Sequence, residues 1–418
     1  MTHGFEEACR FLFPRTFAGR PWSLEPTRAL LAELGHPEHQ YPVVHIGGTN
    51  GKGSVSVLAC AALREAGRSV GLYTSPHLVD VRERIVVDER PMTPEAFARW
   101  TERLRPAIER TGASFFEALT AIALADFAAR GVDLAVVEVG LGGRLDSTNV
   151  VQPLASAVTN IALEHTEYLG ATLPAIAREK AGIAKPGVPF VIGEADRELA
   201  ALLAQESAGR GAAPIVRVPP GAEYAGVLGL QGPHQGRNAA VAVALLDVLP
   251  HGWRPGSAAV TAGFSRARLA GRFDRRGRWI FDVAHNPAGI AVLVRALRAV
   301  DLARPVHALV GILADKAWRE MLAGLGDVVD GIWLTTPPTA PPDRRWDLED
   351  VGQEVRRSGG PGHLRPPGRL HGHPPIIEPD FDRALREVQE GAGTVLVTGS
   401  FHTVGDALAR LPGFPPLG

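Results

Sequence analysis

The sequence predicts a two-domain α/β protein, with an N-terminal P-loop-type domain built on a parallel sheet and a smaller doubly wound C-terminal domain. Short apolar runs alternate with helical patterns, as they do in repeated βα units. One of these runs leads into a glycine-rich loop that contains a lysine. With 418 residues and 45% hydrophobic content, the chain is too long for one ordinary core and apolar enough for two. We expect the domains to cover residues 1–270 and 271–418.

The first domain is predicted from four apolar runs that are continuous rather than alternating, as strands covered on both faces are. The expected strands are Val43–Ile46, Val70–Tyr73, Leu134–Val139 and Ala155–Thr159. The expected helices are Val55–Ala66, Pro94–Arg110 and Phe116–Arg130. Thr93 before Pro94 indicates an N-cap followed by a first-turn proline, and Gly67 indicates a C-cap.

The second domain is predicted from a further series of apolar runs. The expected strands are Trp279–Val283, Val306–Gly311, Gly331–Thr335 and Thr394–Thr398, with helices between them. The charged stretch Arg266–Arg278 lies between the two series and is interpreted as a hinge or linker. Two segments rich in proline and glycine, Pro337–Pro342 and Gly359–Pro375, are predicted to be loops, the second unusually long.

The run from Val43 to Ser54 carries the clearest functional signal. An apolar strand is followed by Gly47-Gly48-Thr49-Asn50-Gly51-Lys52-Gly53 and then by a helix. Glycines let successive backbone N–H groups turn toward one anion, the helix dipole adds a positive end, and the lysine adds a charge. The spacing departs from a Walker A loop, because Gly53 separates the lysine from Ser54. The run predicts a polyphosphate-binding loop, and a glycine-rich turn with a solvated lysine is the alternative.

The overall composition points to small-molecule partners. Lys and Arg total 44 against 45 Asp and Glu, a formal charge of −1, which argues against a broad surface for nucleic acid or anionic membranes. The two cysteines, Cys9 and Cys60, do not make a disulfide framework. No apolar run approaches the ~20 residues of a membrane span, and charges interrupt any signal-peptide core near the start. We therefore expect a cytoplasmic location.

Seven further motifs, together with the loop, carry a resemblance that covers most of the chain. They are Thr74–Leu78, Glu138–Asn149, Glu164–Thr166, Arg178–Ile183, Asp282–Pro287, Asp315-Lys316 and Gly399–Thr403. In this order they resemble the Mur ligase superfamily, and the closest match is folylpolyglutamate synthase/dihydrofolate synthase. The resemblance implies an ATP-dependent ligase whose first domain binds ATP and carries the substrate loops, and whose second is a glutamate ligase domain.

The resemblance implies a magnesium site. Glu138 lies at the carboxyl end of a predicted parallel strand, where such sheets bind ligands. A strand-terminal glutamate paired with Arg144 is the alternative. By resemblance Glu138, Ser75 and His165 bind Mg²⁺, and we expect two ions in all. Mg²⁺ prefers oxygen ligands, so His165 is assigned on the resemblance alone.

The roles of two further residues, Glu164 and Lys180, are also interpreted by the resemblance. Family members usually have Asp-His where this chain has Glu164-His165, which leaves any direct role of Glu164 open. A lysine in the helical stretch Ala175–Ile183 would by default be a surface charge. By resemblance Lys180 instead carries a carbamate that supports a magnesium site. The expected catalytic residues are Lys52, Lys180 and His165.

The resemblance distributes the other ligands over both domains. The expected ATP-binding residues are Thr49, Asn50, Gly51, Lys52, Gly53, Ser54, Asn238, Arg272, Asp282 and His285. For Asn238, Arg272 and Asp282 the alternatives are capping, linker charge and strand termination. Arg272 and Asp282 flank the proposed hinge, so we expect ATP to be held between the domains. The expected glutamate-binding residues are Asp315, Lys316, Ser400 and His402.

Two segments resemble the pterin-contacting segments of bifunctional family members. The expected pterin- or folate-binding residues are Ser114, Phe115, Phe116, Leu145, Asp146 and Ser147. An aromatic pair before a helix is otherwise most often part of a core. Alanine is common in the family in place of Ser147, which leaves the choice of substrate open.

These observations predict a ligase that adds L-glutamate to dihydropteroate, to reduced folates, or to both, through an acyl phosphate. We expect a monomer that binds folate or dihydropteroate, L-glutamate and ATP, and neither nucleic acid nor membrane. One alternative is a Mur-type ligase that joins an amino acid to a different carboxylate, although too little chain precedes the loop for a nucleotide-sugar domain. The other is a non-catalytic ATP-binding regulator, against which Glu138, His165, Lys180 and Lys316 together argue.

Overall fold

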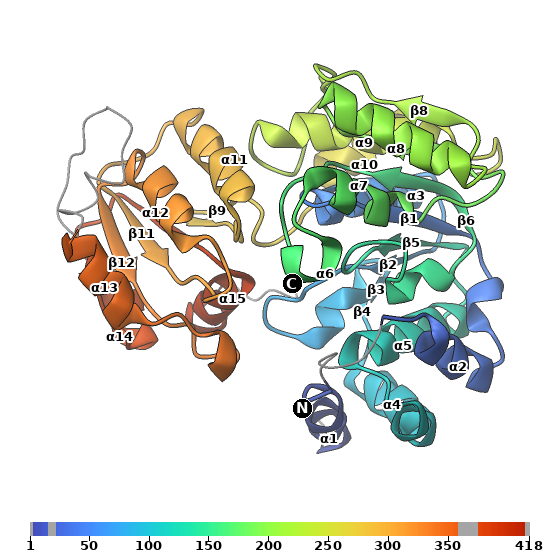
Figure 1. The fold of residues 1–418 in the computed structure, drawn as a ribbon, viewed down its shortest axis with the longest axis horizontal. Coiled ribbons are helices and arrows are strands. Elements are labelled where there is room, and N and C mark those ends of the chain that lie inside the picture. Colours follow the sequence, from blue (N-terminus) through green and yellow to red (C-terminus); the bar gives the residue numbers. More distant parts are fainter. Residues whose placement is uncertain (1–2, 16–21, 358–374, 414–418) are drawn as a thin grey trace. The chain divides into compact units, whose positions relative to one another are not determined.

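Figure 1 shows the computed structural model of the chain, which describes residues 3–15, 22–357 and 375–413. The chain forms two compact units. Unit 1 comprises Met1–Pro76, Val81–Gly229 and Gly236–Ala267, and unit 2 comprises His77–Asp80, Leu230–Gln235 and Arg268–Gly418. The loop expected at 359–375 lies, except for Pro375, outside the described residues. No described helix is both long and apolar enough to cross a membrane.

Unit 1 is built on an eight-stranded sheet in the order β4-β3-β2-β5-β1-β6-β7-β8. The strands are β1 (Val43–Gly47), β2 (Val70–Tyr73), β3 (Ile85–Val87), β4 (Arg90–Pro91), β5 (Leu134–Glu138), β6 (Pro153–Val158), β7 (Phe190–Ile192) and β8 (Ile215–Arg217). All neighbours are parallel except β2 with β3 and β3 with β4. The four strands expected from the sequence are present with ends shifted by two residues at most.

Helices cover both faces of this sheet, as Figure 1 shows. They are α1 (His3–Leu12), α2 (Glu25–Glu33), α3 (Lys52–Glu65), α4 (Pro94–Thr111), α5 (Phe115–Ala129), α6 (Thr166–Leu169), α7 (Leu173–Ala181), α8 (Arg197–Gly209), α9 (His234–Asp247) and α10 (Ser257–Arg266), with 3₁₀ turns η1 (Pro37–His39), η2 (Val81–Arg84) and η3 (Ser147–Val150). Thr93 caps α4 by accepting a hydrogen bond from the Ala96 N–H, as predicted. After α3 the C-cap residue is Ala66, and Gly67 follows it in a left-handed conformation.

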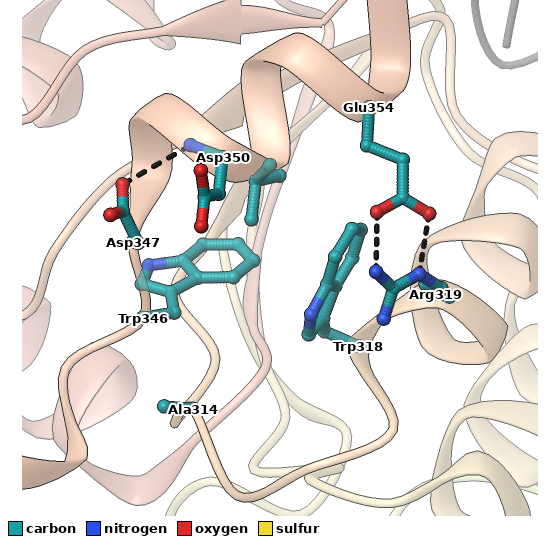
Figure 2. A pocket seen from close by; sticks show the side chains of 8 residues that line it. Ala314, Trp318, Arg319, Trp346, Asp347, Asp350 and Glu354 are labelled. Atoms are coloured by element: carbon teal, nitrogen blue, oxygen red, sulfur yellow. Dashed lines mark hydrogen bonds and ion pairs between the residues drawn. The ribbon is translucent and has the colours of Figure 1, made fainter. Parts of the chain in front are cut away.

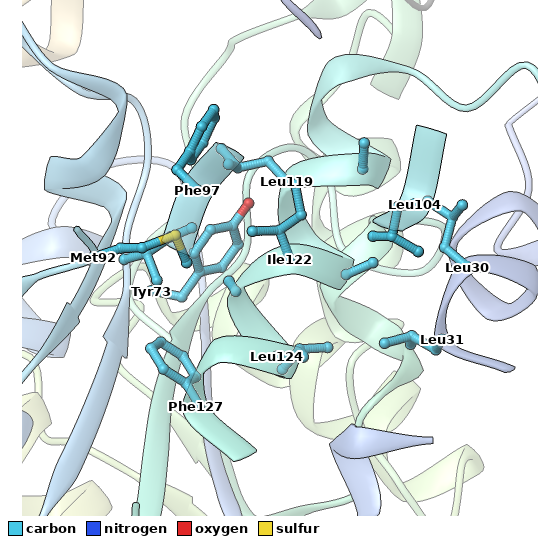
Figure 3. Close-up of a cluster of buried hydrophobic side chains, with 14 of the residues drawn as sticks. Leu30, Leu31, Tyr73, Met92, Phe97, Leu104, Leu119, Ile122, Leu124 and Phe127 are labelled. Carbon is cyan, nitrogen blue, oxygen red and sulfur yellow. The ribbon is translucent and has the colours of Figure 1, made fainter. Parts of the chain in front are cut away.

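One face of the sheet packs on α5 through a large apolar cluster, part of which is drawn in Figure 3. Strand residues Tyr73, Ala135 and Val137 meet buried residues of α5 such as Leu119 and Ile122. Side chains alternate between the faces of a strand, so their neighbours in sequence point toward the α3 side. Burying one large apolar side chain contributes about 1.5–3 kcal/mol, so this cluster holds the strands in register.

Unit 2 is built on a smaller sheet in the order β13-β12-β11-β14-β10-β9. Its strands are β9 (Asp274–Arg276), β10 (Trp279–Phe281), β11 (Val306–Val310), β12 (Gly331–Leu334), β13 (Ile376–Ile377) and β14 (Thr394–Thr398). Its helices are α11 (Pro287–Arg298), α12 (Trp318–Gly326), α13 (Leu348–Arg357), α14 (Phe381–Glu387) and α15 (Phe401–Arg410), with the 3₁₀ turn η4 (Pro342–Arg344). Apolar clusters lie on both faces, as the doubly wound prediction requires.

The segment expected to be a hinge, Arg266–Arg278, has regular structure at its ends. Arg266 is the last residue of α10, and β9 pairs antiparallel with β10. Phe273 lies between them and is buried in the core of unit 2. The division between the two units falls between Ala267 and Arg268, inside this stretch, while its apolar residue and its strand belong to unit 2. Its role as a hinge stays a prediction.

Candidate active site

The glycine-rich loop lies between the central strand β1 and α3. Gly51 is the N-cap of α3 and has a φ of 83°, a conformation that glycine adopts without strain. A Cβ atom at Gly51 would lie 2.5 Å from the Asn238 Oδ1. The loop therefore requires glycine at this position, and the fold brings Asn238 against the expected ATP-binding loop.

A segment that follows β6 holds the loop in place. The backbone N–H groups of Thr49 and Asn50 donate to the Asn160 carbonyl and to its Oδ1, each over 2.9 Å. The Thr159 hydroxyl donates to the Asn50 carbonyl over 2.7 Å. The sequence analysis missed Thr159 and Asn160, although their place directly after a buried strand could have drawn attention to them.

Two lysine side chains converge on this loop. The Lys52 Nζ donates to the carbonyl oxygens of Gly48 and Thr49 over 3.0 and 2.9 Å. The Lys180 Nζ donates to the same Gly48 oxygen over 2.8 Å and to the Glu164 Oε1 over 2.7 Å. Lys180 lies in the last turn of α7, and its side chain is only 1% exposed. The default interpretation of Lys180 as a surface charge is therefore wrong.

Burial and charge shift the pKa values of this cluster. Burial lowers the pKa of Lys180 to about 8, and the Lys52 charge acts in the same direction while Glu164 opposes it. Burial alone would raise the pKa of Glu164, but the charges of Lys180 and Lys52 outweigh it and lower that pKa to about 2. Glu164 is therefore a carboxylate that neutralises one of the two lysines, and the positive charge of the other is left for an anion.

The residues expected to hold magnesium lie at the carboxyl edge of the sheet. Glu138 is the last residue of β5 and is buried, and its Oε2 accepts a hydrogen bond from the Ser75 N–H over 3.1 Å. His165 follows Glu164 and is the N-cap of α6, in a left-handed conformation. The alternative pairing of Glu138 with Arg144 is not what the fold uses, because the Arg144 guanidinium pairs with Glu179 over 2.9 Å.

Phe116, in the first segment expected to bind the pterin ring, packs against Gly140, close behind Glu138 in the chain. A Cβ atom at Gly140 would lie 2.3 Å from the Phe116 Cζ, so the ring packs against the backbone of Gly140. The Phe116 ring also stacks on Tyr73, with centroids 6.0 Å apart. Phe116 is half-buried. Its position next to a strand-terminal carboxylate allows a part of the ring to face a ligand.

Other members of this predicted group have structural partners. Ser114 caps α5 in a capping box with Glu117, and Phe115 packs edge-on against Phe13. The Asp146 carboxylate accepts hydrogen bonds from the backbone N–H groups of Leu141 and Thr148, and burial raises its pKa. Leu145 is half-buried, and Ser147 is buried as the first residue of η3. These contacts shape the loops, and direct contact with a substrate stays a prediction.

In unit 2 three of the expected ATP-binding residues lie close together. The Asp282 carboxylate accepts hydrogen bonds from the N–H groups of Phe273 and Ala284 over 2.8 and 2.9 Å. Burial raises the pKa of Asp282 to about 6 against the charge of Arg272. The Arg272 guanidinium and the His285 ring both lie near Phe401, 4.8 and 5.5 Å from its ring centroid.

The residues expected to bind glutamate lie in the loop that follows β11 and at the start of α15, which follows β14. The Asp315 carboxylate pairs with the Lys316 Nζ over 3.0 Å and with Arg344 over 2.9 Å. The Ser400 hydroxyl caps α15, and the His402 Nδ1 lies 3.0 Å from the Thr339 hydroxyl. Burial lowers the pKa of His402. The sequence analysis missed Arg344, which is 29 residues from its partner and carries no motif.

A pocket of about 290 Å³ lies between α12 and α13, as Figure 2 shows. The rings of Trp318 and Trp346 face it, and an Arg319–Glu354 ion pair closes one side. It contains none of the residues expected from the sequence, although its lining residue Ala314 directly precedes Asp315.

The fold and the two-lysine loop define the chain as a Mur-type ligase. Residues 46–217 match the Mur ligase middle domain, and residues 267–401 match the Mur ligase, glutamate ligase domain. A dihydrofolate synthase/folylpolyglutamate synthase of Mycobacterium tuberculosis is 32% identical over 92% of this chain and 89% of its own length. The chain therefore belongs to the folylpolyglutamate synthase/dihydrofolate synthase family, which confirms the resemblance seen in the motifs.

Other relatives include a longer protein and two solved complexes. A probable bifunctional folylpolyglutamate synthase/dihydropteroate synthase of Halobacterium salinarum is 35% identical over 97% of this chain, which spans only 51% of that protein. A solved Escherichia coli structure in complex with DHPP and ADP has a TM-score of 0.82 and 30% identity, with 97% of each chain covered. A bifunctional enzyme with Mn, AMPPNP and L-glutamate bound has a TM-score of 0.78 and 29% identity, with 97% of each chain covered.

Proposed function

We propose that this chain is an ATP-dependent ligase that adds L-glutamate to dihydropteroate and to reduced folates. The observation that carries the proposal is the convergence of Lys52 and Lys180 on the Gly48 carbonyl, at the end of β1. Two ammonium groups face one carboxylate there, so a polyphosphate that enters the loop meets a net positive charge. The relatives with ADP or AMPPNP bound support ATP as the nucleotide.

The reaction proceeds by activation of a carboxylate. The γ-phosphoryl group passes to the folate carboxylate, which gives an acyl phosphate and ADP. The glutamate amine attacks the acyl carbon, and phosphate leaves as the amide bond forms. Lys52 stabilises charge on the transferred group, and the remaining contribution of the protein is to position the reactants.

The chemistry of the donor set at the edge of β5 fits a divalent cation. Glu138 and the hydroxyl of Ser75 offer oxygen ligands, which magnesium prefers, and Glu138 is a buried carboxylate. When bound, the metal supplies positive charge that offsets the phosphates. His165 completes the proposed set. The relative with Mn bound supports a divalent metal. A second ion stays a prediction.

The residues around Lys180 do not fit a carbamate. Its Nζ donates both to a carbonyl oxygen and to the Glu164 carboxylate, and a carbamate anion would face two groups of the same sign. The lowered pKa of Lys180 does favour the neutral amine that CO₂ requires. We therefore derive no catalytic step from the carbamate. Carbon-13 NMR of the enzyme in labelled bicarbonate tests for it, since a carbamate gives its own carbonyl resonance.

The experiment that tests the function offers the purified chain ATP, Mg²⁺ and L-glutamate with either dihydropteroate or tetrahydrofolate. Glutamate-dependent release of ADP with both acceptors supports the bifunctional proposal. Turnover of tetrahydrofolate alone leaves only a folylpolyglutamate synthase. ADP release with neither acceptor, but with another carboxylate, supports a different Mur-type ligase, and no ADP release at all supports a regulator.

Phe116 provides a more specific test of the dihydropteroate site. An aromatic contact beyond area burial contributes about 0.5–1.5 kcal/mol, so Phe116→Ala should weaken dihydropteroate binding by roughly tenfold. The affinity for ATP should not change, because the residues proposed to bind ATP, the glycine-rich loop and Asn238, do not include Phe116. Titration of each ligand measures this. An equal loss of affinity for dihydropteroate and for ATP, or a large fall in the melting temperature, would mean that Phe116 is only a core residue.

A further inference from the structure

The turn between α2 and β1 carries a cluster of metal-ligating side chains that the ligase chemistry does not use. It consists of His36, Glu38 and His39, on and beside the 3₁₀ turn η1. One ligand atom from each residue lies within 4.8 Å of the others. The Glu38 Oε1 is 3.0 Å from the His36 Nδ1 and 3.6 Å from the His39 Nε2.

Glu38 is buried in an unusual way for a carboxylate. Its side chain is only 6% exposed, and among the described residues its ion pairs are with these two imidazoles. Its Oε2 is buried and has no hydrogen-bond partner in the described part of the chain. The nearby Tyr41 hydroxyl does not serve it, because it donates to the Leu124 carbonyl over 2.7 Å. A buried carboxylate left in this state is costly unless a cation neutralises it.

The two imidazoles are presented toward solvent. The side chains of His36 and His39 are 52% and 68% exposed, and their rings stack with centroids 5.4 Å apart and planes 11° from parallel. An ion can therefore enter from solvent without any rearrangement of the core. The cluster combines an accessible rim of nitrogen ligands with a buried carboxylate beneath it.

We propose that His36, Glu38 and His39 bind a divalent transition-metal ion of the zinc class. Two imidazole nitrogens and one carboxylate oxygen form a ligand set found in three-ligand zinc sites with an open position. Bonds of about 2.0–2.2 Å to one ion separate neighbouring ligand atoms by roughly 3–3.5 Å. The distances from the Glu38 Oε1 to the His36 Nδ1 and to the His39 Nε2, 3.0 and 3.6 Å, are close to this range. Magnesium does not compete well, since it prefers oxygen ligands in octahedral geometry.

Such an ion would stabilise the turn that connects α2 to β1. The turn follows α2 and ends four residues before Val43, the first residue of the strand that carries the phosphate loop. An ion that binds the folded turn and not the unfolded chain stabilises unit 1 by mass action. The site is separate from the proposed ligase residues, so the rate of glutamate addition should not depend on it.

The test uses the full metal-free chain in saturating Mg²⁺ and titrates it with Zn²⁺ in a calorimeter, alongside Co²⁺ absorption spectra. The wild-type chain should bind Zn²⁺ at this site and show Co²⁺ bands of nitrogen–oxygen coordination. His36→Gln and His39→Gln should each weaken Zn²⁺ binding by tenfold or more, since even the loss of a residue that only supports a metal ligand costs about 10–100-fold in affinity. His251→Gln is the matched control, since His251 is exposed in the same unit, and it should bind as the wild type does.

A second variant separates this site from the proposed magnesium site. His165→Gln should leave Zn²⁺ binding at the turn intact, and His36→Gln should leave ligase turnover intact. Melting temperatures without metal establish that each variant folds. Equal Zn²⁺ affinity in wild type, His36→Gln and His39→Gln, or no binding in the wild type, would overturn the proposal and leave the cluster as an ion pair only.

Discussion

The phosphate loop of unit 1 and the Asp315 loop of unit 2 each bring two cations near one carboxylate, but at different depths. Glu164 pairs with Lys180, is also influenced by the charge of Lys52, and has a side chain that is 10% exposed. Asp315 pairs with both Lys316 and Arg344, and its side chain is 36% exposed. The same charges therefore act in different surroundings. Breaking a buried ion pair costs much stability, whereas an exposed pair contributes little. Burial, and not the number of charges, therefore decides how much each cluster contributes to the free energy of unfolding.

The pKa values follow the same difference. At Glu164, burial is outweighed by two ammonium charges, and the pKa falls to about 2. At Asp315, partial burial is outweighed by Lys316 and Arg344, and the pKa falls below its ordinary value.

Glu164→Gln should give the largest effect, because it leaves the Lys180 ammonium buried without its counter-charge. The expected loss is about 3–5 kcal/mol in the free energy of unfolding, measured by chemical denaturation. The double variant Glu164→Leu with Lys180→Met is the control and should recover most of the loss, since it buries no charge. A single-variant loss below about 1 kcal/mol would show that the pair behaves like an exposed one.

Lys52→Ala should lower kcat by about 10²–10³-fold, or about 2.7–4 kcal/mol, because it removes preorganised charge from the transferred phosphoryl group. The fold should change little, since Lys52 is half-buried and contacts only carbonyl oxygens of its own loop in the hydrogen bonds described above. Removal of its charge should also raise the pKa of Lys180. A folded variant with near-normal kcat would remove the loop from the mechanism.

Acid should weaken unit 1 through Glu164. The folded pKa of about 2 lies below the ordinary 4.5, so the stabilisation is complete above about pH 4.5 and is lost as pH falls toward 2. The expected loss is about 3 kcal/mol. Unfolding of the wild type and of Glu164→Gln should be compared across this range, and their difference should shrink with acid. A constant difference would contradict the lowered pKa.

Asp315→Asn should give the smallest effect, below about 1 kcal/mol in the free energy of unfolding, because the pair is partly exposed and screened by salt. Arg344→Gln tests the same pair from its other side. Denaturation at low and high salt measures both. A loss as large as that of Glu164→Gln would mean that exposure does not distinguish the two clusters.

The regular elements could be predicted from the sequence because their signals are local. Continuous apolar runs located the parallel strands, and Thr93-Pro94 located the start of α4. The glycine-rich loop was also recognisable, since its chemistry lies within eight consecutive residues.

The partners of the site residues could not be predicted, because they depend on tertiary packing. Glu164 reaches Lys180 across 16 residues, and Arg344 reaches Asp315 across 29. No local pattern indicates that Lys180 is buried or that Asn160 supports the loop. For the same reason, the charge density of Arg266–Arg278 did not reveal that Phe273 packs in a core.

The central place of β1 has a consequence for how the protein is made. Val43 pairs with Ala135 on one side and with Pro153 on the other, and the loop that follows is held by Asn160 and Lys180. On the ribosome, the first strand of the nucleotide site must therefore wait for β5 while on the order of 90 more residues are synthesised, roughly 5–20 s at typical rates. During that interval an apolar strand has no partner, which makes this segment a natural client for chaperones that bind nascent chains.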